Sequence, residues 1–187
     1  MDTTTLIILF SVLLIGVVGI IAVIFLKGRK TERLRTRFGP EYARAVQESG
    51  GRRQGEAGLQ DREKRVEGFA IRPLVPSDRE LYIASWRKVQ AEFVDDPKTS
   101  VTQADKLLGD VMSTRGYLVG EFDQRSADIS VNHPLVVEHY RAAHEIAVRH
   151  ARDEASTEDL RQAMIHYRTL FDELDGEPEM ARAKAAS

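Results

Sequence analysis

Cysteine is absent from the chain. Its absence excludes a disulfide framework, a thiolate metal site and a cysteine nucleophile. The motifs of phosphate-binding loops, dinucleotide-binding turns, zincin proteases and serine hydrolases are also missing. No two histidines have the i, i+3 or i, i+4 spacing with which a helix holds a metal ion. The sequence therefore predicts no catalytic residue, no metal site and no cofactor.

Net charge is also small, at −2, but it is unevenly distributed. Residues 27–67 contain twelve Lys or Arg and seven Asp or Glu, whereas residues 68–187 contain fifteen and twenty-one. A domain that binds nucleic acid needs positive charge on its folded surface. The acidic body therefore argues against nucleic acid as a partner.

One long apolar run is present, at residues 6–26, with no charged side chain and a single hydroxyl at Ser11. As a helix these residues would span roughly 30 Å, the thickness of the bilayer hydrocarbon core. The preceding MDTTT has no Lys or Arg, and no small-x-small cleavage site follows, so the run differs from a signal peptide. We expect a single transmembrane helix.

The residues that follow the run are strongly basic and are expected to fix its orientation. Cytoplasmic flanks of membrane spans are rich in Lys and Arg, which predicts that residues 1–5 lie outside and the body lies in the cytoplasm. The same residues can bind anionic lipid headgroups, at about 1 kcal/mol each near the surface. They are Lys27, Arg29, Lys30, Arg33, Arg35 and Arg37.

Residues 27–76 are interpreted as a juxtamembrane neck and linker. An apolar stripe with a four-residue repeat is interrupted by Gly39-Pro40, which predicts a kink or a new helix from Pro40 to near Ser49. The glycine-rich residues 49–55 predict a flexible linker, and residues 56–67 predict a solvated helical spacer. Residues 69–75 predict an extended segment against the first helix of the body. The stripe consists of Leu34, Phe38, Tyr42 and Val46.

Residues 77–176 predict an antiparallel bundle of four to five helices, so that the fold class is all-α. Start signals are a capping box at Ser77, a cap and first-turn proline at Asp96-Pro97, and a second capping box at Ser156. A shorter, less regular helix is expected within residues 117–131. The small, charged residues 177–187 predict a disordered tail.

The helix expected over residues 134–152 is apolar around most of its circumference when projected at 100° per residue. This pattern predicts that it lies at the centre of the bundle. Two of its histidines, His139 and His150, are about 16 Å apart along the helix axis and cannot share a metal ion. The histidines are therefore expected to form ordinary hydrogen bonds at helix boundaries.

A polar stretch just before this helix is the one candidate site. It is expected on irregular structure, where its side chains would converge on an anion, a metal ion or a catalytic water. A structural interpretation is equally concrete: Asn132 or His133 caps the helix that begins at Pro134, and Asp128 pairs with Arg125. The candidate binding residues are Asp123, Arg125, Asp128 and His133.

Five motifs give the chain a family resemblance. They are RFGPEYARAV (37–46), FVDDP (93–97), VMSTRGY (111–117), DQRSADISVNHPLVVEHYRAAH (123–144) and EASTEDLRQAMIHYRTLF (154–171). With them the chain resembles an uncharacterised family of bacterial proteins, many of which carry one N-terminal span. The resemblance implies a bacterial cell membrane and transfers no activity or catalytic residue.

These patterns together predict a membrane-anchored cytoplasmic helical module that binds an unidentified protein partner. Two alternatives come from other functional classes. One is a hydrolase or metal-dependent enzyme that uses the polar stretch from Asp123 to His133. The other is a small-ligand sensor with a cavity beside Trp86 in the bundle core.

Overall fold

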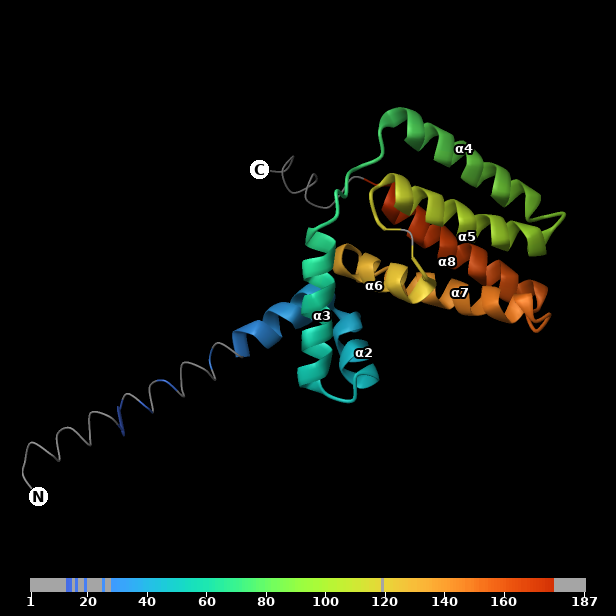
Figure 1. The fold of residues 1–187 in the computed structure, drawn as a ribbon. Helices are drawn as coiled ribbons and strands as arrows, with labels where there is room; N and C mark the ends of the chain where they lie inside the picture. The colour runs from blue at the N-terminus through green and yellow to red at the C-terminus, as the bar shows by residue number, and fades with distance from the viewer. Residues whose placement is uncertain are drawn as a thin grey trace, which may run out of the picture. The chain divides into compact units, whose positions relative to one another are not determined.

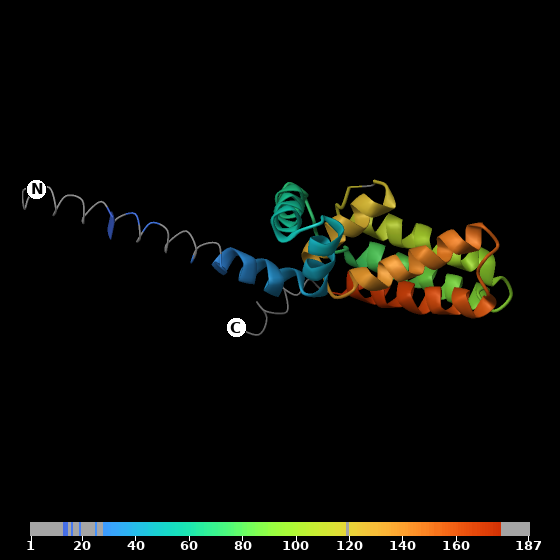
Figure 2. The same ribbon diagram turned by 90° about the horizontal axis from the view of Figure 1, so that it is seen from below.

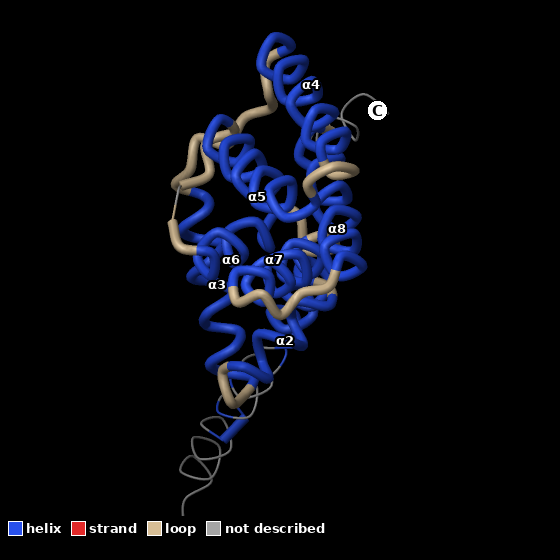
Figure 3. The backbone as a smooth tube through the Cα atoms, turned by 90° about the vertical axis from the view of Figure 1, so that its right-hand side faces the viewer, coloured by secondary structure: helices blue, strands red, loops and turns tan. Residues whose placement is uncertain are grey.

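A computed structural model describes residues 28–118 and 120–176, together with Leu13, Leu14, Gly16, Gly19 and Phe25. Helices and loops, without a strand, make up this part of the chain (Figures 1 and 3), which confirms the all-α prediction. The chain divides into two compact units, residues 1–57 and 58–187. The predicted bundle begins later, at residue 77.

The apolar run at 6–26 lies outside the described residues except for five positions, and Lys27 and the tail at 177–187 lie outside them entirely. Among the residues that are described, no helix combines the length and the hydropathy needed to cross a bilayer.

In the first unit, residues 28–38 form a helix and α2 (Pro40–Glu48) begins directly after it. Gly39 separates the two with a φ of 50°, and Pro40 occupies the first position of α2. This confirms the predicted new helix, because proline has no N–H to contribute to the preceding helix and its φ suits a first turn. Leu34, Phe38 and Tyr42 of the predicted stripe are buried.

The predicted flexible linker at residues 49–55 is wrong. α3 (Arg52–Glu67) begins inside it, after a turn in which Gly50 has a φ of 72°. A Cβ at Gly55 would lie 2.7 Å from the Cα of Val46, so α2 and the start of α3 touch at their backbones. The glycines therefore permit a tight turn and close helix packing, and not chain flexibility.

The predicted solvated spacer is wrong as well. Leu59, Glu63 and Val66 of α3 are buried, at 0, 5 and 6 % exposure. Their i, i+4, i+7 spacing places them on one face of the helix. The composition of this segment is mostly charged, but three positions on a single face suffice to bury one side of the helix.

The second unit contains α4 (Pro76–Glu92), α5 (Pro97–Thr114), α6 (Phe122–Asn132), α7 (Val137–Ala151) and α8 (Thr157–Asp175). α8 packs against α7 and α5, and α5 packs against α4 (Figures 1 and 2). Tyr82 near the start of α4 is hydrogen-bonded to Thr114 at the end of α5, at 2.7 Å, so these helices are antiparallel. The five-helix bundle agrees with the prediction.

The core of the bundle is formed by the apolar faces of its helices. Seven apolar residues of α8 are buried: Leu160, Ala163, Met164, Tyr167, Leu170, Phe171 and Leu174. On α4, Trp86 stacks on Phe171 of α8 with ring centroids 5.0 Å apart. This contact places α8 in the interior, because it meets α4, α5 and α7.

The helix expected over residues 134–152 does not lie at the centre of the bundle, so this prediction is wrong. α7 begins only at Val137 and packs mainly on α8. Leu135 is 73 % exposed, and Val148 and Ala151 also reach the surface. Alanine accounts for much of the apolar arc, and because it is small and favours helices it is readily tolerated on an exposed face.

The predicted start signals have different outcomes. Asp96 caps α5 by accepting a hydrogen bond from the Thr99 amide at 3.1 Å, as expected. Ser156 and Asp159 form the predicted capping box of α8. The capping box at Ser77 is wrong, because α4 begins one residue earlier at Pro76 and its cap position is Val75.

The extended segment before α4 lies against the core, and part of it follows the end of α5. Phe69, Ile71 and Leu74 are partly buried on the core, whereas Val75 is half exposed. The Arg72 amide donates to the Arg115 carbonyl at 2.9 Å. This hydrogen bond joins the extended segment to the C-terminal end of α5.

The α8 capping box makes stability depend on pH. Hydrogen bonds from Ser156, and then from Arg149, lower the pKa of Asp159 from 3.8 to about 2. Because the pKa is lower in the folded state, the carboxylate stabilises the fold above about pH 4, and this contribution is lost as the pH falls towards 2. We expect Asp159→Asn to lower the thermal unfolding midpoint at pH 7 and to have a smaller effect as the pH approaches 2.

Asp172→Asn is the matched control, because Asp172 lies on α8 with its side chain 65 % exposed. It should leave the midpoint nearly unchanged across the same pH range. A deficit of Asp159→Asn that stayed constant down to pH 2 would contradict the role of its ionised form.

Candidate functional site

The predicted polar corner is mostly helical, since its residues from Asp123 to Asn132 belong to α6. Asp128 is 2 % exposed and accepts hydrogen bonds from Arg65 of α3, at 2.8 Å to Nε, and from Gln124, at 2.9 Å. The Arg65 Nη2 atom lies 2.7 Å from the same carboxylate oxygen. The predicted pairing of Asp128 with Arg125 is therefore wrong, because a partner 63 residues away in the chain occupies it.

His133 is 8 % exposed, and its Nδ1 lies 3.0 Å from Glu173 of α8. It does not cap α7, whose cap position is Val136 and has no side-chain hydrogen bond. Asn132 donates to the Tyr117 hydroxyl at 3.2 Å. Both residues thus connect the corner to other parts of the bundle, in place of the local capping that was expected.

The two remaining candidates have different surroundings. Asp123 is exposed in the first turn of α6. The guanidinium of Arg125 lies over α5, where a Cβ at Gly109 would be 3.1 Å from its Nη1. Asp123 thus faces solvent, whereas Arg125 contacts α5, Asp128 contacts α3 and His133 contacts α8. These contacts hold parts of the fold together and do not bring the four side chains to one point.

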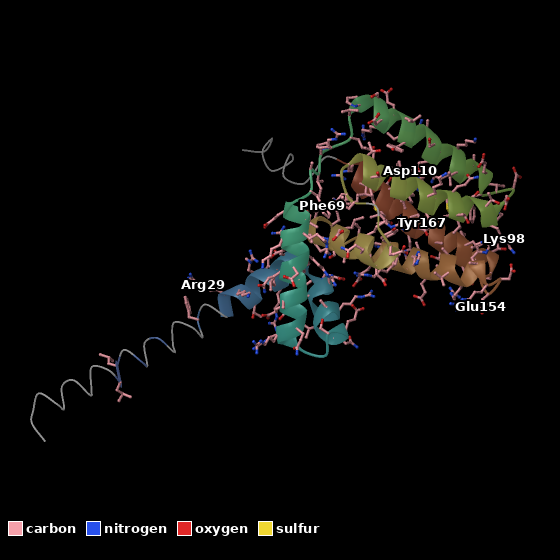
Figure 4. The ribbon with its side chains drawn as sticks, in the orientation of Figure 1. Arg29, Phe69, Lys98, Asp110, Glu154 and Tyr167 are labelled. Atoms are coloured by element: carbon pink, nitrogen blue, oxygen red, sulfur yellow. The ribbon has the colours of Figure 1, made fainter. Side chains whose placement is uncertain are left out.

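A second polar group, which the sequence analysis missed, lies where α5, α6, α7 and α8 meet. We call it the Tyr140 cluster, and Figure 4 labels one member, Tyr167. Tyr167 donates to Asp105 Oδ1 at 3.2 Å. Tyr140 is fully buried, yet its hydroxyl has no hydrogen-bond partner. The cluster consists of Asp105, Arg125, Tyr140, His144 and Tyr167.

Burial sets the protonation states in the Tyr140 cluster. It raises the pKa of both tyrosine hydroxyls, and the charge of Asp105 raises them further. Burial also lowers the pKa of His144, against the opposing influence of Asp105. The Phe122 ring stacks on the His144 ring at a centroid distance of 3.5 Å. Neutral phenols and a neutral imidazole are therefore the favoured forms near pH 7.

Three buried atoms of the cluster lack a hydrogen-bond partner: Arg125 Nε, Tyr140 Oη and His144 Nδ1. Arg125 and Tyr140 can donate hydrogen bonds here, and His144 can donate or accept according to its tautomer. A buried polar atom that makes no hydrogen bond costs about 1 to 3 kcal/mol. The cluster therefore contains hydrogen-bonding atoms that the fold leaves unused.

A second feature that the sequence did not predict joins α7 and α8. His139 Nδ1 lies 2.9 Å from His166 Nδ1, and the ring centroids are 5.2 Å apart. Burial lowers the pKa of His166, and the charge of His139 lowers it further. The i, i+3 and i, i+4 spacings identify histidine pairs within one helix only. This pair is separated by 27 residues and depends on the antiparallel packing of two helices.

Larger metal-binding groups are not found where the chain is described: no three His, Cys, Asp or Glu side chains there are arranged to hold an ion. Comparisons of the chain with protein-family models, curated proteins and solved structures find no match.

Proposed function

We propose that the chain is a single-pass protein of the bacterial cell membrane that holds a helical interaction module at the cytoplasmic face. The observation that carries the proposal is the uncharged run of 21 residues at 6–26, followed at once by a basic segment. Hydropathy supports the span, and the Lys and Arg excess supports the orientation.

The described residues of the run fit this proposal. Leu13, Leu14 and Phe25 are helical, and their side chains are 64, 55 and 58 % exposed. Large apolar side chains in these positions are suited to lipid. The Arg29 guanidinium lies 4.5 Å from the centre of the Phe25 ring. A cation is attracted to the face of an aromatic ring, and Lys and Arg are enriched at the cytoplasmic end of a membrane span.

The helix at 28–38 separates a basic face from an apolar one. At 100° per residue, Arg29, Lys30, Arg33 and Arg37 fall within an arc of about 100°, and all four are exposed. Leu34 and Phe38, on a neighbouring arc, are fully buried. The basic face is suited to anionic headgroups, while the apolar face is buried.

An interaction role is proposed for the bundle because its predicted polar corner is engaged in contacts within the fold. Asp128 pairs with Arg65 and His133 with Glu173, so neither is held ready for a substrate. The partner is proposed to be a protein, in keeping with the acidic body. The resemblance to a bacterial family with one span is part of the same proposal.

A double charge substitution in the span tests the membrane anchor. Each arginine at the centre of a transmembrane helix costs about 2.5 to 3.5 kcal/mol on insertion scales. We expect the full chain to stay in the membrane fraction after alkaline carbonate extraction, and the Ile15→Arg/Val18→Arg chain to be released. Val94→Arg, at a position that is 82 % exposed in the bundle, is the control and should be retained. Release of the unaltered chain would contradict the proposal.

A small-ligand sensor is a second candidate function. The Tyr140 cluster is a better candidate for its ligand site than the predicted cavity beside Trp86. Trp86 is already covered by Phe171, whereas three polar atoms of the cluster lack partners. Titration of the full chain with acetate or phosphate tests this candidate. Trp86 fluorescence and the thermal unfolding midpoint are the readouts. Saturable stabilisation that disappears in Tyr140→Phe would favour the sensor, and no response would exclude these ligands.

A further inference from the structure

The polar contacts between α7 and α8 include one pair that differs from the others. Arg149 of α7 pairs with Asp159 of α8 at 3.0 Å, and His133, in the turn before α7, pairs with Glu173 of α8 at 3.0 Å. Both pairs are complementary in charge. His139 and His166 instead bring two groups of the same kind together, and two imidazoles repel one another when both are protonated.

The distance between the two Nδ1 atoms agrees with a metal-ligand geometry. Late first-row metal ions hold imidazole nitrogens at about 2.0 Å. Two such nitrogens are then about 2.8 Å apart in neighbouring positions of a square-planar or octahedral ion, and about 3.3 Å apart in a tetrahedral one. The observed 2.9 Å is close to the first value.

We propose that His139 and His166 form a two-histidine site for a divalent nickel or copper ion that links α7 to α8. Square-planar and tetragonal geometry with nitrogen ligands is typical of these two metals. Each ring contributes its Nδ1 lone pair, and a small rotation of the rings directs both lone pairs at the ion. The ring whose Nδ1–H forms the present hydrogen bond changes to its Nε2–H tautomer, so that both Nδ1 lone pairs face the ion and no proton is lost overall.

The surroundings of the pair suit metal binding. Both side chains are partly exposed, so an ion can enter from solvent. Metal ions bind imidazole in its neutral form, so the site should fill at neutral pH and empty in acid. Only two protein ligands are supplied, because no group of three potential ligands occurs among the described residues. The remaining positions on the ion are therefore open to water or to an exogenous ligand.

Binding of nickel chloride to the full chain in detergent, purified without a histidine tag, tests the proposal. We expect one saturable nickel site in calorimetry and a higher thermal unfolding midpoint with nickel. His139→Asn and His166→Asn should each weaken binding at least about tenfold, because asparagine retains hydrogen-bonding groups but is a poor ligand for these metals. His150→Asn, on the same helix α7, should bind as the unaltered chain does.

Copper paramagnetic resonance provides an independent readout. One bound Cu²⁺ per chain should show splitting from two equivalent imidazole nitrogens, and a single nitrogen in either variant. The proposal is overturned if the unaltered chain binds no nickel at one equivalent, or if His150→Asn loses as much affinity as the other two variants. In either case the 2.9 Å contact is a hydrogen bond alone.

Discussion

Replacing Arg115 with alanine is expected to lower the free energy of unfolding of the bundle by about 3 kcal/mol. Arg115 is 2 % exposed and is among the largest fully buried side chains of the described structure. Its Nη1 donates to the Leu174 carbonyl at 2.7 Å and its Nε to the Arg72 carbonyl at 3.4 Å. The substitution removes both bonds and leaves a cavity between α5, α8 and the segment before α4.

The position of Arg115 explains why the effect should be large. The Leu174 carbonyl belongs to the last turn of α8, where carbonyl groups lack partners in the helix and carry partial negative charge. A guanidinium at this point therefore satisfies an acceptor and complements the helix dipole. Once the side chain is removed, that carbonyl is left buried without its donor.

Trp86 fluorescence during urea unfolding measures the change, because Trp86 is the only tryptophan and lies in the bundle core. Arg161→Ala is the control: Arg161 pairs with Glu158 on the surface of α8, and because water and salt screen such an exposed pair, its loss should have little effect on stability. If Arg115→Ala cost no more than Arg161→Ala, the buried guanidinium would not be stabilising the junction.

Gly116→Ala is expected to destabilise the bundle by about 2 to 4 kcal/mol. Gly116 ends α5 with a φ of 95°, a conformation that disfavours every residue with a Cβ. An added Cβ would also lie 2.4 Å from the Ala70 carbonyl oxygen, so the backbone of the adjoining segment would have to shift. The same denaturation experiment measures the loss.

Gly58→Ala is the matched control and should have the opposite sign. Gly58 lies inside α3, and a Cβ there would meet nothing within 4 Å. Alanine in the interior of a helix is favoured over glycine by about 0.5 to 1 kcal/mol. Equal effects of the two substitutions would show that neither the φ of Gly116 nor its contact with Ala70 is responsible.

Local signals in the sequence predicted much of the bundle. Proline at positions 40 and 97 and the Ser156 capping box mark real helix starts. Each of these features depends on residues within about one or two helical turns, which a sequence displays directly.

The errors arise where the outcome depends on residues far apart in the chain. The predicted partner of Asp128 is its near neighbour Arg125, but Asp128 pairs with Arg65, 63 residues away in the chain. Residues 56–67 contain only two large apolar residues, Leu59 and Val66, which predicts a solvated helix, yet both are buried.

The Tyr140 cluster and the His139–His166 pair were missed for the same reason. Tyr167 and Asp105 are 62 residues apart, and the two histidines are 27 apart. Only the packing of four helices brings the first group together, and only the antiparallel pairing of α7 with α8 brings the second. No spacing rule within one helix could have found either group.

The central claim is that the span holds the helical module at the cytoplasmic face, and a topology reporter tests it most directly. Alkaline phosphatase, which folds into an active enzyme only outside the cytoplasm, is fused to the C-terminus of the full chain and expressed in bacteria. We expect an inactive fusion in the membrane fraction. It should become active when Arg29, Lys30, Arg33 and Arg37 are replaced by glutamine and arginines are added before residue 6. High phosphatase activity of the unaltered fusion would instead place the module outside the cytoplasm.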